Sequence, residues 1–376
     1  MSPAARRAPR RSATAKSSKT SAGFTPLLRD LLSARGPSGY ESAPADVWLD
    51  AASKFAKVST DVLGTPLALV APKHGHEKAP RRLLVMGHID EIGLIVTHID
   101  DDGYLWFREV GGWDAQILVG QRVVLDTSDG VVAGVVGKKP IHLLRDEERK
   151  KVAAIRDLHI DIGARDGEQA RKLVRIGDVG VIDVQPVELP NGRLTSRALD
   201  NRLGSFVALE AARLIAKAGG AQWEIAAVAA AQEETTFGGS RTSAFSLEPD
   251  AAIVVDVTHA TDAPGIDVKE AGKHELGSGP VITRGSTLNN AVFELLVSAG
   301  EAEEISFTVE ASGRATGTDA DAVHLSRGGV PTGLVSIPIR YMHSPVELVQ
   351  LDDVHASARL IAAAALRLTR ETSFAR

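Results

Sequence analysis

The pattern of apolar residues predicts alternating strands and helices over most of the chain. Three continuous apolar runs, at residues 224–231, 251–257 and 332–339, have the length and composition of strands buried on both faces. Between residues 200 and 218 the apolar residues instead recur with a helical period, and a Gly-Gly pair ends this helix. Strands separated by helices are typical of an α/β sheet.

The two ends of the chain follow the same pattern. Short amphipathic helices are predicted at residues 24–36 and 43–56, and short apolar strands at residues 66–72 and 81–87. A long helix is predicted at residues 351–371. These segments extend the α/β pattern to nearly the whole chain.

The pattern changes at residues 93–177, where Gly, Val and Asp are frequent and the helical period is lost. Strands and turns predominate there, with one short helix predicted at residues 166–174. We therefore expect an inserted β-rich domain at 93–177, within a mixed-sheet α/β domain formed by residues 24–92 and 178–370. The apolar strand at residues 178–184 is assigned to the α/β domain.

Residues 1–23 contain six Lys and Arg residues, no acidic residue, and many Ala and Ser residues. A segment of this composition buries too little apolar surface to fold alone, which predicts a disordered basic tail. A targeting segment and a partner-binding arm are the alternatives. The segment lacks the apolar stretch of a secretory signal.

Composition limits the classes of function. The 376 residues are 44% hydrophobic, enough for a large core. With a net charge of −5 and no apolar run near the roughly 18 residues of a membrane span, we expect neither a nucleic-acid nor a membrane partner. The absence of cysteine excludes disulfides, thiolate metal sites and a cysteine nucleophile, and it fits a cytoplasmic protein. Any metal would be held by His and carboxylate side chains.

Side chains of the metal-ligand type follow the predicted buried strands or open a helix. They are His88, Asp200, Glu234, Asp256 and His343. Because ligands bind at the carboxyl ends of strands in open α/β sheets, we expect these side chains to converge. Single residues have ordinary alternatives: Asp200 as a helix N-cap, and the pair Glu233 and Glu234 as solvated charge.

Two imidazoles and three carboxylates form a ligand set that zinc and similar divalent ions favour. Five side chains are too many for one tetrahedral ion, but they suit two ions that share a bridging carboxylate. Two ions roughly 3.5–4 Å apart can stabilise both the attacking and the departing oxygen in a hydrolysis. The pattern therefore predicts a dinuclear hydrolytic centre.

The chain resembles the dinuclear metallo-aminopeptidases of the glutamyl aminopeptidase and tetrahedral aminopeptidase type (metallopeptidase family forty-two). The matching stretches run in the family's order over residues 24–370. They are GPSGYE, GHIDEIG, ALDNRLG, QEE, DVTHATDAPG, LGSGPVI and TGTDADAVHLSRGGVPTGLVSIPIRYMHSPVE. The resemblance implies an α/β catalytic domain of the zinc-exopeptidase type that removes N-terminal residues from short peptides.

The resemblance also implies a role for each matching side chain. Glu233 would be the general base that accepts a proton from the attacking water, and Asp90 would orient His88. The implied metal ligands are His88 and Asp256 for one ion, Glu234 and His343 for the other, and Asp200 as the bridge. The two ions would be zinc, with cobalt or manganese as alternatives.

The family further implies dimer contacts through the inserted domain and a hollow tetrahedral dodecamer built from dimers. The chain departs from the family at residues 235–240, TTFGGS, and at Thr65, where an Asn is common. Two other functions remain as alternatives. One is a related dinuclear amidohydrolase, such as a deacylase or a carboxypeptidase-like enzyme, and the other is a catalytically silent scaffold.

Overall fold

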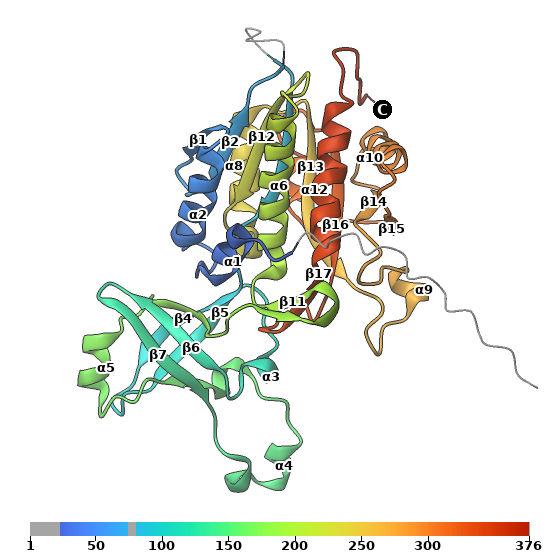
Figure 1. Ribbon diagram of the computed structural model, residues 1–376. Coiled ribbons are helices and arrows are strands. Elements are labelled where there is room, and N and C mark those ends of the chain that lie inside the picture. Colours follow the sequence, from blue (N-terminus) through green and yellow to red (C-terminus); the bar gives the residue numbers. More distant parts are fainter. Residues whose placement is uncertain (1–22, 74–79, 376) are drawn as a thin grey trace, which may run out of the picture.

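A computed structural model describes residues 23–73 and 80–375 of the chain (Figure 1). Except for Gly23, the tail expected at residues 1–23 lies outside these described residues. The chain forms a layered α/β domain and a separate β-barrel, which lies below that domain in Figure 1. The predicted fold class, a mixed-sheet α/β domain with an inserted β-rich domain, is confirmed.

The α/β domain is built on one 11-stranded mixed sheet. In spatial order its strands are β1 (Lys57–Thr60), β2 (Pro66–Val70), β12 (Glu224–Ala230), β3 (Arg82–His88), β13 (Ala251–His259), β16 (Thr332–Arg340), β17 (Glu347–Gln350), β11 (Arg193–Ser196) and β10 (Val187–Leu189), with β14 (Val281–Gly285) and β15 (Thr308–Ser312) joined to it through β16. The four strands from β12 to β16 are parallel, and β2, β14 and β17 join them in antiparallel pairs.

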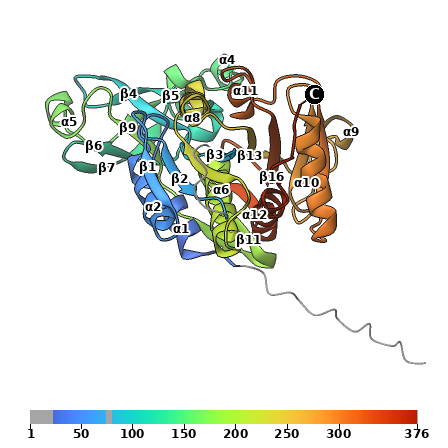
Figure 2. The same cartoon turned by 90° about the horizontal axis from the view of Figure 1, so that it is seen from above.

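Helices cover both faces of the sheet (Figure 2). One face carries α1 (Pro26–Ser33), α2 (Ser42–Ser53), α6 (Leu199–Lys217), α10 (Asn290–Ala302) and α12 (Leu351–Leu366), and the other carries α8 (Gly238–Leu247) and α11 (Ala320–Val323). Two short helices, α7 (Glu233–Thr236) and α9 (Val268–Ala271), lie in connections. Within residues 23–73 and 80–375, no helix combines the length and apolar character needed to cross a membrane.

The continuous apolar runs of the sequence are the central strands β12, β13 and β16, as predicted. Nearly every residue in them is buried, because helices pack on both faces of the sheet. Helix α6 crosses β3 closely at two glycines. A Cβ atom on Gly87 would lie 2.4 Å from the carbonyl carbon of Gly204, so a side chain there would push the helix away.

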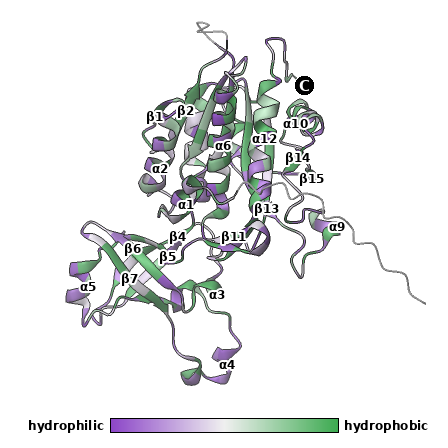
Figure 3. Cartoon of the chain, in the orientation of Figure 1, coloured by the Kyte–Doolittle hydropathy of each residue, from purple (hydrophilic) through white to green (hydrophobic). Residues whose placement is uncertain are grey.

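The inserted domain is a closed barrel with its own apolar core. Its strands, in order around the barrel, are β4 (Gly93–Ile99), β5 (Leu105–Val110), β8 (His159–Asp161), β7 (Gly130–Gly137), β6 (Arg122–Thr127) and β9 (Val179–Ile182). Its helices are α3 (Ala115–Leu118), α4 (Asp146–Arg149) and α5 (Gly167–Leu173). The hydrophilic α4 lies in an extension between β7 and β8 (Figure 3).

The structure corrects the expected end of the inserted domain. The strand at residues 178–184 was assigned to the α/β domain, but β9 pairs with β4 and β6 inside the barrel. Gly180 lies opposite Leu94 on one side and Leu125 on the other. The sequence of an apolar strand does not indicate which sheet the strand joins, so this strand fits either domain. The barrel therefore closes with Ile182.

Candidate metal centre and active site

The candidate ligands converge where the chain passes from the central sheet into the barrel. His88 is the last residue of β3. Asp256 lies level with it in β13, because the parallel register pairs Val254 with Met86 two residues earlier. Asp256 was expected at a strand end, but β13 continues three residues further, to His259. Both ligands therefore sit on paired strands.

Two further candidate ligands, Asp200 and His343, lie on irregular backbone. Asp200 lies at the start of α6 with non-helical φ and ψ of −78° and 106°, and the Asp200–Asn201 peptide bond is cis. His343 follows β16 in a turn and has a φ of 58°, in the left-handed region that non-glycine residues rarely adopt. Contacts beyond regular secondary structure must hold these two residues.

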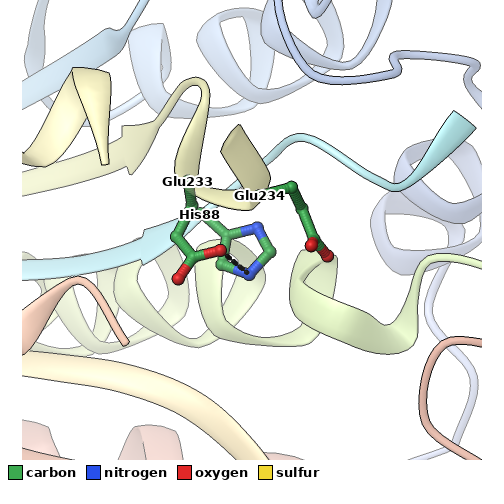
Figure 4. Close-up of side chains that lie close together, drawn as sticks. All are labelled: His88, Glu233 and Glu234. Atoms are coloured by element: carbon green, nitrogen blue, oxygen red, sulfur yellow. Dashed lines mark ion pairs between the residues drawn. The ribbon is translucent and has the colours of Figure 1, made fainter. Parts of the chain in front are cut away.

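Glu233 and Glu234 open α7, separated by two residues from the end of β12. Figure 4 shows the carboxylate of Glu233 directed at the ring of His88, with the carboxylate of Glu234 on the other side of that ring. The Oε2 atom of Glu233 lies 3.6 Å from Nε2 of His88. The Oε1 atom of Glu234 lies 3.4 Å from Nε2 of His343, so the two adjacent glutamates pair with different imidazoles and can perform different tasks.

Three groups of three side chains among the described residues could each hold a divalent ion. One consists of His88, Glu233 and Glu234, and the other two are sets that share Asp200. The sets are His88, Asp200 and Asp256, and Asp200, Glu234 and His343, and in each set one ligand atom per residue lies within 4.8 Å of the others. Oδ1 of Asp200 lies 3.2 Å from Nε2 of His88, and Oδ2 lies 3.4 Å from Nε2 of His343. A carboxylate that turns one oxygen to each set has the arrangement of a bridging ligand.

The charges of the site fit bound cations. Burial raises the pKa of Glu233 to about 10, and nearby carboxylates add to this rise. Contacts with Asp200 and Glu234 raise the pKa of His343 to about 11. Carboxylates crowded in a buried site repel one another, and divalent ions would offset this repulsion. The donor set of imidazole and carboxylate groups also matches the preference of zinc and related ions.

The barrel orients one of the two imidazoles. Nδ1 of His343 lies 2.9 Å from the carbonyl oxygen of Gly112, a barrel residue 231 positions away in sequence. With the Nδ1 proton donated to this carbonyl, Nε2 is free to face Asp200 and Glu234. Such hydrogen bonds to the outer nitrogen fix the tautomer of metal-binding histidines.

Asp90 contacts three residues of the site. Its Oδ1 lies 3.3 Å from Nδ1 of His88, although the angles do not make a hydrogen bond. Its two oxygens accept the backbone N–H groups of Glu233 and Glu234, each at 3.1 Å. Asp90 therefore holds the turn that carries both glutamates. Its expected role in orienting His88 stays a prediction.

Other buried carboxyl groups surround the site and were not singled out from the sequence. Glu347 accepts backbone N–H groups from Asp200 and His343. Asp319 is 1% exposed, its burial raises its pKa to about 6, and its charge contributes to the raised pKa of Glu233. Both residues lie in the last matching block of the family, which is the only sequence signal for them.

The segment at residues 235–240 packs tightly although it departs from the family. Gly239 lies against the end of β12, where an added Cβ would come within 2.4 Å of the nitrogen of Ala231 and 2.6 Å of Oγ1 of Thr65. The Thr235 hydroxyl lies 2.9 Å from that of Ser38. Thr65, the other departure, thus contacts the same turn, so the two differences from the family are neighbours in space.

Comparison with known proteins shows the family to which the chain belongs. The family model of the M42 glutamyl aminopeptidases matches residues 68–360. The lysyl aminopeptidase of Pyrococcus furiosus is 35% identical over 340 residues, covering 89% of this chain and 94% of that protein.

Solved structures agree as well. A TET aminopeptidase from the marine sediment archaeon Thaumarchaeota archaeon SCGC AB-539-E09 superposes with a TM-score of 0.85 at 35% identity, covering 92% of this chain and 97% of its own. The Pyrococcus horikoshii TET1 peptidase, which can assemble into a tetrahedron or a large octahedral shell, gives a TM-score of 0.79 at 31% identity, with coverages of 91% and 99%. The chain therefore belongs to the M42 glutamyl aminopeptidase family, and it is a metallo-aminopeptidase.

Proposed function

We propose that the protein removes N-terminal residues from short peptides at a centre that holds two divalent ions. The observation that carries this proposal is the position of Asp200, whose two oxygens face two different imidazoles. The ligands would be His88 and Asp256 for one ion, Glu234 and His343 for the other, and Asp200 as the bridge. This donor set suits zinc, and cobalt or manganese accept the same ligands.

When bound, the two ions supply Lewis-acid polarisation of the scissile carbonyl and make a water more acidic. Glu233 is the proton acceptor in this proposal. It belongs to neither set that shares Asp200, although its carboxylate lies beside His88 and forms a third candidate group with His88 and Glu234. Its carboxylate would accept a proton from the attacking water and pass it to the departing amine.

The proposal requires a free N-terminus and no particular first residue. Arg340 is close in sequence to His343 and would suit an acidic substrate side chain. However, its guanidinium already pairs with the carboxylate of Asp262, with Nη2 2.5 Å from Oδ2. The positive charge of Arg340 is therefore balanced inside the protein, and it gives no support to a glutamyl preference.

We also propose that the chains assemble through the barrel into dimers and then into a tetrahedral dodecamer. The assembly of the related TET1 peptidase supports this. Three apolar side chains on the extension around α4, Ile141, Leu143 and Val152, are each more than 60% exposed, as expected of a surface that another chain covers. Light scattering should give the mass of about twelve chains, and a monomer at micromolar concentration would contradict the proposal.

A panel of aminoacyl-p-nitroanilides and short peptides tests the proposed activity. We expect cleavage that a chelator abolishes, that zinc, cobalt or manganese restores, and that N-acetylation of the substrate blocks. Release of acetate from the N-acetylated substrates, without release of p-nitroaniline, would favour the deacylase alternative. Protein that binds no metal and cleaves nothing would favour a silent scaffold.

A further inference from the structure

Glu347 connects the two ligand-bearing segments that lie on irregular backbone. It is the first residue of β17, where antiparallel pairing with Ser196 of β11 fixes its place at the sheet edge. Its side chain is buried, with only 2% of the residue exposed. Asp200 follows β11 by four residues, and His343 precedes Glu347 by four. The carboxylate therefore lies between the two segments.

Each oxygen of this carboxylate holds the backbone of a different ligand. Oε2 accepts the N–H group of Asp200 at 3.1 Å, and Oε1 accepts the N–H group of His343 at 2.8 Å. Glu347 is in none of the groups of candidate metal ligands found among the described residues. Its two oxygens are used to place ligands rather than to bind an ion.

We propose that Glu347 is a positioning residue. It holds the backbones of Asp200 and His343 so that the bridging carboxylate of Asp200 and the imidazole of His343 are correctly placed to bind one of the two metal ions. This inference rests on the proposed dinuclear function. A carboxyl group that accepts one N–H group on each oxygen holds the two backbone segments at a fixed separation. Outer residues that orient ligands commonly change metal affinity when they are mutated.

The effect should differ between the two ions. His88 and Asp256 lie on the paired strands β3 and β13, which hold their backbones without help from Glu347. His343 lies in a turn with a left-handed φ, and Glu347 is its backbone acceptor. Loss of Glu347 should therefore weaken the set formed by Asp200, Glu234 and His343 more than the set formed by His88, Asp200 and Asp256.

Helix α12 offers a matched control. Asp353 is 1% exposed and also accepts two backbone N–H groups, from Gly277 at 2.7 Å and from Gly279 at 2.8 Å. None of these residues belongs to the candidate centre. Asp353→Asn thus removes the same kind of contact from the same domain, and it reports how much stability such a contact supplies.

The test is a zinc titration of the metal-free full chain against a chromophoric chelator, which resolves the two affinities. His343→Ala removes a ligand of one set only, and Asp256→Ala removes a ligand of the other, so these variants identify the two binding steps.

In Glu347→Gln, an amide NH₂ group replaces one of the two carboxyl oxygens. It faces a backbone N–H group and cannot accept a hydrogen bond from it. We expect this variant to weaken the step that His343→Ala abolishes by about 10- to 100-fold. The other step should change less than about threefold, and Asp353→Asn should leave both steps unchanged.

Equal weakening of both steps, or no weakening, would overturn the positioning role. Wild-type protein that binds fewer than two zinc ions would instead contradict the proposed dinuclear function, so the two failures are distinct. If Glu347→Gln does not fold, Glu347→Asp takes its place. The shorter side chain reaches only one of the two N–H groups, and the same selective weakening is expected. Equal weakening of both steps in Glu347→Asp overturns the role as well.

Discussion

Single residues of the candidate centre are oriented by contacts that do not involve a metal ion. The carbonyl of Gly112 faces Nδ1 of His343, and the oxygens of Asp90 accept the N–H groups of Glu233 and Glu234. The sequence could single out the proposed ligands, because most of them lie at the end of a strand or at the start of a helix, although Asp256 lies inside β13. The role of Gly112 could not be predicted. It contacts His343 through its backbone carbonyl from 231 residues away, and every residue has such a carbonyl, so the sequence does not distinguish this one.

Zinc binding should release protons. In the metal-free protein, Asp200 and Glu234 raise the pKa of His343 to about 11, so its imidazole is protonated at pH 7. A metal ligand must be neutral imidazole, so binding displaces this proton and zinc affinity rises with pH. Calorimetry at pH 7 in buffers of different ionisation enthalpy should show the release. His343→Ala should release about one proton fewer, and a zinc affinity that is constant from pH 6 to 8 would contradict the expectation.

Helices and strands could be predicted where their pattern of apolar residues is compatible with only one structural environment. Continuous apolar runs identified β12, β13 and β16, because only strands covered on both faces tolerate such sequences. The apolar strand β9 was assigned to the wrong domain, because its pattern fits a barrel and a layered sheet equally. The close crossing of α6 over β3 depends on two glycines that are far apart in sequence, so their contact could not be predicted.

Gly87→Ala should destabilise the protein. The new methyl group would meet the backbone of Gly204, which cannot move without shifting α6, and overpacking of this kind costs about 1–3 kcal/mol. The control is Gly328→Ala, because an added Cβ there has no described neighbour within 4 Å. Urea denaturation of both variants in chelator separates packing from metal binding. Equal unfolding free energies for Gly87→Ala and the control would show that the crossing tolerates a side chain.

At the scale of the whole molecule, the barrel completes the active site of the α/β domain. The carbonyl of Gly112 in the barrel contacts His343, and the guanidinium of Arg35, just after α1, pairs with Asp126 of β6 at 2.7–3.0 Å. The position of the barrel is therefore coupled to the orientation of a proposed ligand. The existence of an inserted domain could be predicted from the change in pattern, but its docking could not, because docking depends on contacts between distant segments.

Arg35→Ala should loosen the barrel. The pair with Asp126 is about one-third exposed on each side, so its loss should cost at most about 1 kcal/mol and speed amide exchange in β6 and β9 roughly two- to fivefold. Arg29→Ala is the control, since Arg29 in α1 pairs with Glu188 in a more exposed contact within the α/β domain. Hydrogen exchange followed by mass spectrometry compares amide exchange in the barrel of the Arg35→Ala and Arg29→Ala variants. Unchanged exchange in the barrel of Arg35→Ala would show that other contacts dock it.

The most direct test of the central claim is the Glu233→Gln variant, assayed for bound metal and for turnover in the same preparation. Glu233 is proposed to accept the proton of the attacking water and not to belong to the two ligand sets that share Asp200. The variant should retain two ions per chain and lose turnover by about 10²- to 10⁴-fold, the contribution expected of a general base. Near-normal turnover with two bound ions would show that Glu233 is not the proton acceptor. Loss of an ion together with activity would show that it is a ligand.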